Sequence, residues 1–227
     1  MKNLLLLAFS ASLIGGANAA TVFADDFSEA DGTDVSGKAP DVGNPWTGSS
    51  VLLASGRLDT SGAARTVFGS FTSALGAGQV LTLTYDTFAV GGGNFFGGGY
   101  AGVSLYTAGE ERVFTGDTGA GAFWGVDGGA INSAPFISSD DTATTTATFT
   151  YFYDTGNWTF ATTSGVDFSG TAAVADAFDE LRIANGAGGD IAVDNINVDI
   201  SAIPEPASLF LLGLGAVGSC MRRQRRA

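Results

Sequence analysis

The sequence predicts an all-β protein, an antiparallel sandwich of two sheets with jelly-roll topology preferred. Short segments of alternating apolar and polar residues recur along the chain, and turns rich in Gly, Asp and Asn separate them. Glycine is frequent, at 34 of 227 residues, and we find no convincing helical period between residues 21 and 202. Many short strands at regular spacing with turns between them are typical of sandwiches.

The clearest alternation predicts a strand over Thr142–Tyr153, with Phe149 and Tyr151 on one face. Ile191–Ile200 alternates as well, which directs Ile196, Val198 and Ile200 inward. The body opens with Ala24–Phe27, and the other predicted strands are Val51–Leu58, Ala64–Phe71, Val80–Val90, Tyr100–Tyr106, Glu110–Phe114, Ala122–Val126, Trp158–Thr162 and Ala177–Ala184.

The N-terminus has the three parts of a secretory signal peptide. Lys2 supplies the positive charge, Leu4–Ile14 is apolar, and Ala17-Asn18-Ala19 is a small-residue cleavage site. The apolar stretch is too short for a membrane span. We therefore predict a signal helix over residues 1–20 that signal peptidase removes on export, leaving a mature sandwich domain over residues 21–202.

The C-terminal segment, residues 203–227, has three parts in a fixed order. A PEP triplet (Pro204, Glu205 and Pro206) is followed by the apolar Ala207–Met221 and then by an arginine cluster (Arg222, Arg223, Arg225 and Arg226). The prolines end the preceding strand, and the arginines hold their end on the cytoplasmic side of a membrane. A helix over 207–221 spans about 22 Å at about 1.5 Å per residue, less than the ~30 Å hydrocarbon core. This length suits transient anchoring.

This segment resembles the PEP-CTERM sorting signal of Gram-negative bacteria that make exopolysaccharide. The resemblance implies that a membrane-embedded exosortase recognises the PEP triplet, that the arginine cluster stops transfer, and that the apolar tail is removed. The mature protein is then released or attached at the cell surface. The alternative is an ordinary C-terminal membrane anchor with a chance PEP triplet, and either reading predicts export.

Composition excludes several classes of function. The body has 22 acidic residues, which is all of the chain's 23 except Glu205, against five basic residues, a net charge of −17. Such a surface repels nucleic acids and either attracts divalent cations or simply keeps the protein soluble. The chain has no histidine, and its one cysteine is Cys220. Ser-His-Asp and Cys-His catalysis, His-bound zinc, thiolate metal sites and body disulfides are therefore excluded.

The two ends of the body resemble concanavalin-like and carbohydrate-binding jelly-roll domains. The residues concerned are Asp25-Asp26-Phe27, Phe178–Ile183 and Val193–Ile196. In such domains the first and last strands lie side by side, and a structural calcium ion often links them. The resemblance thus implies Asp26 and Asp194 as calcium ligands, since carboxylates suit calcium. The alternative is that these acids cap turns in water.

Aromatic residues near the glycine-rich Gly91–Gly99 are candidates for contact with sugars. Phe95, Phe96 and Tyr100 can offer flat apolar faces to a glycan. We expect the three tryptophans, Trp46, Trp124 and Trp158, to be core residues.

No catalytic pair of carboxylates is recognisable. Glu110 and Glu111 are adjacent, so they point to opposite sides of a strand. We therefore expect a non-enzymatic, exosortase-sorted protein of the cell surface or extracellular matrix with a structural or adhesive role. The alternative is a carbohydrate-binding module or a divergent glycoside-active enzyme of concanavalin-like fold. Extracellular polysaccharide is the expected ligand partner in either case.

Overall fold

A computed structural model describes residues 19–88, 99–119, 123–131, 136–137 and 144–203. Residues Ala19–Ala202 make up one compact unit. The predicted terminal helices, at 1–20 and 207–221, fall almost wholly outside the described residues. In the part of the chain that is described, no helix is long and apolar enough to cross a membrane.

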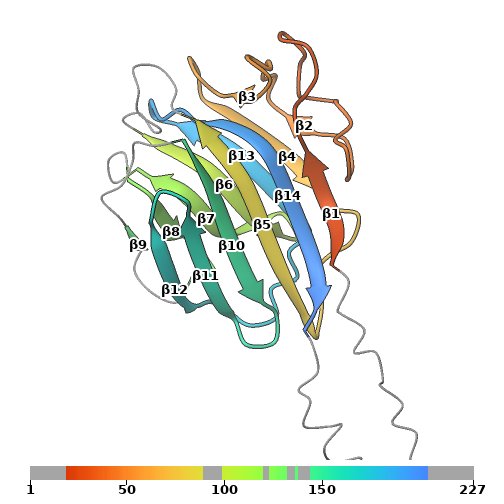
Figure 1. Ribbon diagram of the computed structural model, residues 1–227, viewed down its shortest axis with the longest axis vertical. Helices are drawn as coiled ribbons and strands as arrows, with labels where there is room; N and C mark the ends of the chain where they lie inside the picture. Colours follow the sequence, from red (N-terminus) through yellow and green to blue (C-terminus); the bar gives the residue numbers. More distant parts are fainter. Residues whose placement is uncertain (1–18, 89–98, 120–122, 132–135, 138–143, 204–227) are drawn as a thin grey trace, which may run out of the picture. The chain divides into compact units, whose positions relative to one another are not determined.

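The described chain forms two antiparallel sheets packed as layers (Figure 1). One sheet has the order β1-β14-β5-β10-β11-β12, with β3 paired to β14, and the other has the order β2-β4-β13-β6-β7-β8-β9. The all-β sandwich prediction is confirmed. The strands of the first sheet are β1 (Ala20–Asp25), β3 (Leu58–Asp59), β5 (Gln79–Phe88), β10 (Thr145–Phe152), β11 (Asn157–Thr162), β12 (Asp167–Thr171) and β14 (Ala192–Ala202). Those of the second are β2 (Thr47–Gly48), β4 (Arg65–Ser70), β6 (Tyr100–Thr107), β7 (Glu110–Thr118), β8 (Gly125–Asp127), β9 (Phe136–Ile137) and β13 (Glu180–Gly186).

Alternation along each strand builds the core between the two sheets. In β10, Ala147, Phe149 and Tyr151 are buried while the residues between them are partly exposed, as the sequence pattern predicts. Phe149 lies opposite Leu83 of β5, whose side chain is also buried. Burying a side chain of this size contributes about 1.5–3 kcal/mol, so this register is strongly specified.

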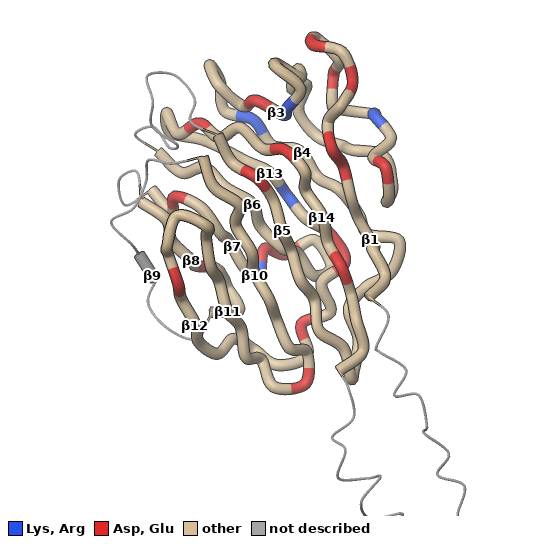
Figure 2. Tube along the Cα trace, in the orientation of Figure 1, with Lys and Arg blue, Asp and Glu red and all other residues tan. Residues whose placement is uncertain are grey.

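The first and last strands pair along their length, with Ala20 opposite Ile200 and Asp25 opposite Ile196 (Figure 1). The pairing brings the loop that follows β1 next to the irregular middle of β14. There the register shifts between Asp194 and Asn197, and Asn195 has a left-handed backbone with φ 47°. Acidic residues from sequence-distant segments therefore meet at one end of the sandwich, where Figure 2 shows several acids in the loops beyond β1.

The aromatic residues fill the core, as expected for the tryptophans. Trp46, Trp124 and Trp158 are all buried. Trp46 packs edge-on against Phe23 of β1 at 5.0 Å between ring centres. Trp124 lies 5.5 Å from Phe160 of β11, so it joins the two sheets.

Several strands differ from the sequence prediction. Val51–Leu58 is largely irregular, because Leu52 and Leu53 make only isolated bridges. Strand β12 was not predicted, because Phe168 is its one large apolar residue. Its residues alternate between exposed and partly exposed, so the apolar pattern of a half-buried strand is missing. The short strands β2 and β9 were also missed. Two-residue strands carry too little pattern to be predicted.

Candidate functional site

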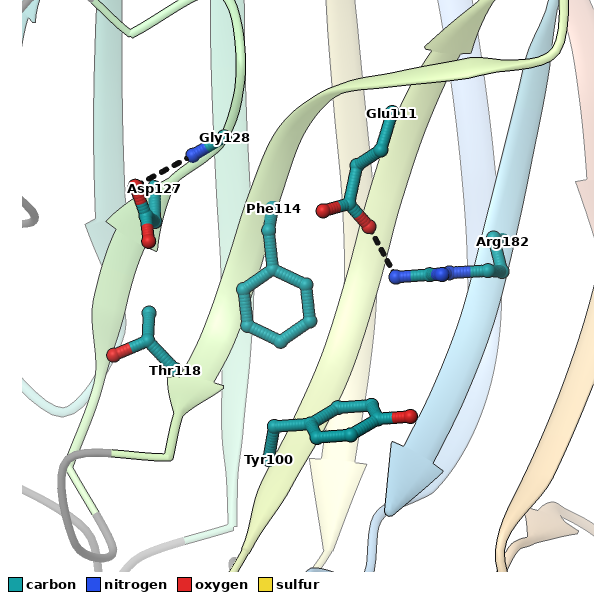
Figure 3. A pocket seen from close by; sticks show the side chains of 7 residues that line it. All are labelled: Tyr100, Glu111, Phe114, Thr118, Asp127, Gly128 and Arg182. Carbon is teal, nitrogen blue, oxygen red and sulfur yellow. Dashed lines mark hydrogen bonds and ion pairs between the residues drawn. The ribbon is translucent and has the colours of Figure 1, made fainter.

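A pocket of about 270 Å³ opens on the outer face of the second sheet, away from the core (Figure 3). Strands β6, β7, β8 and β13 supply its side chains. The lining residues are Tyr100, Glu111, Phe114, Thr118, Asp127, Gly128 and Arg182. Because neighbouring strands place alternate residues on this face, three consecutive strands, β6, β7 and β8, and the sequence-distant β13 contribute to one hollow.

Small residues in the sheet beneath the pocket leave room for two aromatic rings. A Cβ at Gly186 would lie 2.5 Å from Tyr100 Cε1, and one at Gly102 would lie 2.7 Å from Phe114 Cζ. Both distances are too short for real contacts, so each ring lies where a side chain would otherwise stand. Tyr100 remains 39% exposed, and its ring is therefore available to a ligand.

The polar part of the pocket centres on an ion pair between Arg182 and Glu111 (Figure 3). The Ser104 hydroxyl donates to Glu111 Oε2 at 2.8 Å and accepts from Arg182 at 3.1 Å. The guanidinium also lies 5.3 Å from the centre of the Tyr106 ring. Burial raises the pKa of Tyr106, and the positive charge of Arg182 opposes this shift.

Two polar groups in the pocket have hydrogen-bonding capacity to spare. Arg182 Nε is buried and has no hydrogen-bond partner among the described residues. Within the described part of the chain, Asp127 accepts from the backbone N–H of Gly128 at 2.8 Å, and a carboxylate can accept several bonds. The pocket thus combines an exposed aromatic face with a donor and an acceptor.

A second group of polar residues lies at the end of the sandwich where β1 ends. Carboxylate oxygens of Asp25, Asp26 and Asp41 lie within 4.8 Å of one another. Asp41 accepts a hydrogen bond from the backbone N–H of Asp26 at 3.1 Å. Hydrogen bonds from Ser28 lower the pKa of Asp26, so Asp26 is an anion in neutral solution.

Asp194 of β14 belongs to the same end of the sandwich. Burial raises the pKa of Asp194; a hydrogen bond from the Asn195 backbone opposes this, and the negative charges of Asp86 and Asp26 add to the shift. The structure therefore brings the two predicted calcium ligands, Asp26 and Asp194, close enough for their charges to interact. Among the described residues, the carboxylates whose oxygens lie within 4.8 Å of one another are those of Asp25, Asp26 and Asp41, and Asp194 is not part of that group. Calcium binding by Asp26 and Asp194 therefore stays a prediction.

Asp25 does not fit that role, because its oxygens already bind a cation. Lys38 Nζ lies 2.7 Å from Asp25 Oδ1 and 2.8 Å from Oδ2. Burial raises the pKa of Asp25, and the hydrogen bonds from Lys38 and Trp46 oppose the shift. The Asp25 carboxylate is therefore part of a separate cluster with Lys38.

Of the predicted glycan contacts, the structure places Tyr100 in the pocket, whereas Phe95 and Phe96 lie outside the described residues. The PEP triplet and the arginine cluster also lie outside them. Sequence reasoning missed Arg182 and Asp127, and it considered Glu111 only as a catalytic residue. One signal in the sequence could have indicated Arg182: the body has five basic residues against 22 acidic ones. Each arginine there is therefore expected to pair with a carboxylate.

Comparison with known families identifies the C-terminal segment. Residues 202–226 match the PEP-CTERM protein-sorting motif, which confirms the resemblance seen in the sequence. The motif indicates an exported surface protein that is processed by an exosortase. No curated protein sequence matches the chain.

Solved structures show the fold. An endo-1,3-β-glucanase from Streptomyces sioyaensis superposes with a TM-score of 0.54 at 16% identity, covering 81% of this chain and 97% of the glucanase. A sialidase gives 0.52 at 10% identity over 77% of this chain, which spans only 18% of the sialidase's length. A Bauhinia forficata lectin solved with GalNAc gives 0.44 at 10% identity, covering 83% and 100% of the two chains. The superposition on the glucanase confirms the predicted likeness to jelly-roll folds.

Proposed function

We propose that the mature domain is a non-enzymatic adhesive protein that holds extracellular polysaccharide in the pocket at Tyr100. The observation that carries this proposal is the exposed Tyr100 ring, which lies over Gly186 beside a polar hollow. The sorting motif indicates a surface protein, and such a protein meets the polysaccharides outside the cell. The structural neighbour named as an endo-1,3-β-glucanase is consistent with this ligand class.

The chemistry of the pocket suits a sugar ring. The apolar face of a pyranose packs on the Tyr100 ring, while its hydroxyls accept from the exposed part of the Arg182 guanidinium and donate to Asp127. A few fixed polar groups beside an apolar surface are the usual composition of a ligand pocket. The pocket volume of about 270 Å³ suits one or two sugar units of a longer chain.

A binding role is favoured over catalysis because Glu111 is already engaged. Its carboxylate pairs with Arg182 and accepts from Ser104. Glu111 Oε2 is thus occupied by two partners within the protein, whereas the catalytic acid of a glycosidase must be free to donate to the leaving group. One observation supports the second candidate, a glycoside-active enzyme: the carboxylates of Glu111 and Asp127 line the same pocket.

Calcium has a separate, structural role in this proposal. The ion would be held by Asp26 and Asp194, with Asp41 beside them, and would supply positive charge between the first and last strands. The calcium ion would fix the end of the sandwich where β1 and β14 meet. It would lie outside the pocket at Tyr100.

The test is binding of the exported protein to an array of polysaccharides, comparing the wild type with Tyr100→Ala. We expect saturable binding that weakens at least tenfold in the variant, about 1.4 kcal/mol. Leu52→Ala is the matched control, since Leu52 is also an exposed apolar residue but does not line the pocket. Absence of glycan binding, or equal binding by Tyr100→Ala, would contradict the proposal.

The same samples separate binding from catalysis. Release of reducing ends from a bound glycan, lost in Glu111→Gln, would establish the enzyme instead. Intact glycan after prolonged incubation is the result that we expect.

A further inference from the structure

Lys38 is the only lysine in the chain apart from Lys2, and it is buried. Its side chain is 7% exposed, although lysine is among the residues most rarely buried. Its amine contacts two carboxylates: both oxygens of Asp25, at 2.7 and 2.8 Å, and Glu29 Oε1 at 2.8 Å. An amine and two carboxyl groups thus meet in one place.

The Asp25 side chain is 0% exposed and is fixed from every side. The backbone N–H of Phe27 donates to its Oδ1 at 2.9 Å, and Trp46 Nε1 donates to its Oδ2 at 2.6 Å. The aromatic rings of Phe27 and Trp46 pack against each other at 5.8 Å, and Lys38 Nζ lies 5.5 Å from the Phe27 ring. The site therefore has an aromatic wall and little access to water.

The backbone also holds Lys38 in position. Its N–H donates to Val35 at 3.0 Å, and its carbonyl accepts from the Trp46 N–H at 2.9 Å. Since both carboxylate oxygens are within 2.8 Å of Nζ, the carbon between them lies within the near-attack range of about 3–3.5 Å. The two reacting groups are thus held in contact. For attack, Nζ must lose a proton and approach the face of the carboxyl group.

We propose that Lys38 and Asp25 form an intramolecular amide bond, with Glu29 carrying protons between them. The Lys38 nitrogen attacks Asp25 Cγ, a C–N bond forms, and one C–O bond breaks. Glu29, whose Oε1 contacts Nζ at 2.8 Å, accepts a proton from the ammonium and so frees the amine to attack. In all, two of the three ammonium protons end on the departing oxygen, which leaves as water, and the third stays on the amide. Ammonium and carboxylate become amide and water, so atoms and charge balance and no co-reactant is needed.

The surroundings supply what this reaction requires. The N–H groups of Phe27 and Trp46 donate to the two Asp25 oxygens, where negative charge develops during attack. Glu29 is 41% exposed, so it can exchange protons and the water can leave by its side. The product replaces two charges buried at high desolvation cost with one neutral amide.

The bond would give an exported protein a covalent crosslink that needs no cysteine. It would close the loop from Asp25 to Lys38, thirteen residues apart, and fix the end of β1 to the irregular segment after it. The described chain has long stretches without regular strands there, between Asp25 and Thr47. Since the body contains no cysteine, a disulfide cannot serve this purpose.

The test is peptide mass analysis of the full chain after denaturation and digestion with trypsin. An amide on Lys38 blocks cleavage of the Lys38–Ala39 bond. We expect one peptide that ends at Arg57 with a mass about 18 Da below that of its sequence, the mass of one water. Recovery of a peptide that ends at Lys38, with no dehydrated species, would overturn the proposal.

Glu29→Gln tests the mechanism, with Glu110→Gln as the matched control on an exposed glutamate of β7. We expect the peptide ending at Lys38 to appear in Glu29→Gln and the dehydrated peptide to persist in the control. A dehydrated peptide of equal yield in Glu29→Gln would overturn the role assigned to Glu29.

Discussion

Two ion pairs in this protein have similar partners but opposite surroundings. Lys38 and Asp25 meet among aromatic rings at the end of β1, and neither side chain reaches much solvent. Arg182 and Glu111 meet on the outer face of the second sheet, where a pocket opens beside them. Each pair is held by further hydrogen bonds, from Trp46 and Phe27 in the first case and from Ser104 in the second.

The difference in exposure gives the two pairs different uses. A buried pair excludes water and external ligands, so its groups can act only on each other. A pair at the edge of a pocket keeps part of its polar surface for a ligand, since the side chains of Arg182 and Glu111 are 19% and 33% exposed. Substituting one partner of a pair, or one residue beside it, tests this contrast.

The largest effect is expected from Asp25→Ala. The variant leaves Lys38 without its main partner in a buried site and leaves Trp46 Nε1 without its acceptor. Loss of one partner of a buried pair costs about 3–5 kcal/mol, and the variant also loses the proposed amide. The free energy of unfolding in urea should therefore fall by at least this amount. A loss below about 1 kcal/mol, of the size usual for exposed pairs, would contradict the contrast.

Calcium is expected to have the next largest effect, at the acidic end of the sandwich. Binding to the folded state alone stabilises it by about 2.7 kcal/mol when calcium is at one hundred times its Kd. Thermal unfolding with calcium and with a chelator measures this effect. In Asp194→Asn the response to calcium should be much reduced.

The calcium effect and the proposed amide are separable. A chelator reverses the first and leaves the dehydrated peptide intact. An unchanged melting temperature on addition of calcium to the wild type would contradict the ion site.

A smaller effect is expected from Gly186→Ala in the sheet beneath the pocket. The new Cβ would lie 2.5 Å from the Tyr100 ring, so the ring must move. Because the ring is the end of a flexible side chain, the free energy of unfolding should fall by about 1 kcal/mol. The free energy of glycan binding should change by more than the free energy of unfolding does. Gly76→Ala is the control, since its new Cβ would meet Gln79 at an ordinary 3.4 Å, and equal binding by the two variants would contradict the role of the ring.

The smallest effect on stability is expected from Glu111→Gln. The pair with Arg182 is partly exposed, so its loss should cost less than about 1 kcal/mol in urea unfolding. The variant should nevertheless alter glycan binding, because Arg182 is then free to move. A destabilisation as large as that of Asp25→Ala would show that exposure does not distinguish the two pairs.

Much of the fold could be predicted because alternation records which face of a strand is buried. Leu81, Leu83 and Tyr85 share a face in the sequence, and all three are buried in β5. The candidate site was less accessible to prediction. Tyr100 was identified from its glycine-rich neighbourhood, but Arg182 and Asp127 reach the same pocket through pairing of β13, β6, β7 and β8, which local patterns do not encode.

The sequence by itself determined the all-β class, the sorting motif at the C-terminus and the absence of histidine and of body cysteine, because these depend on residue type and local order. Only the tertiary structure decided which charges meet. Lys38 is thirteen residues from Asp25, and Glu111 is 71 residues from Arg182. Strand pairing and burial bring such residues together, and the same burial decides whether each pair faces its neighbours or a ligand.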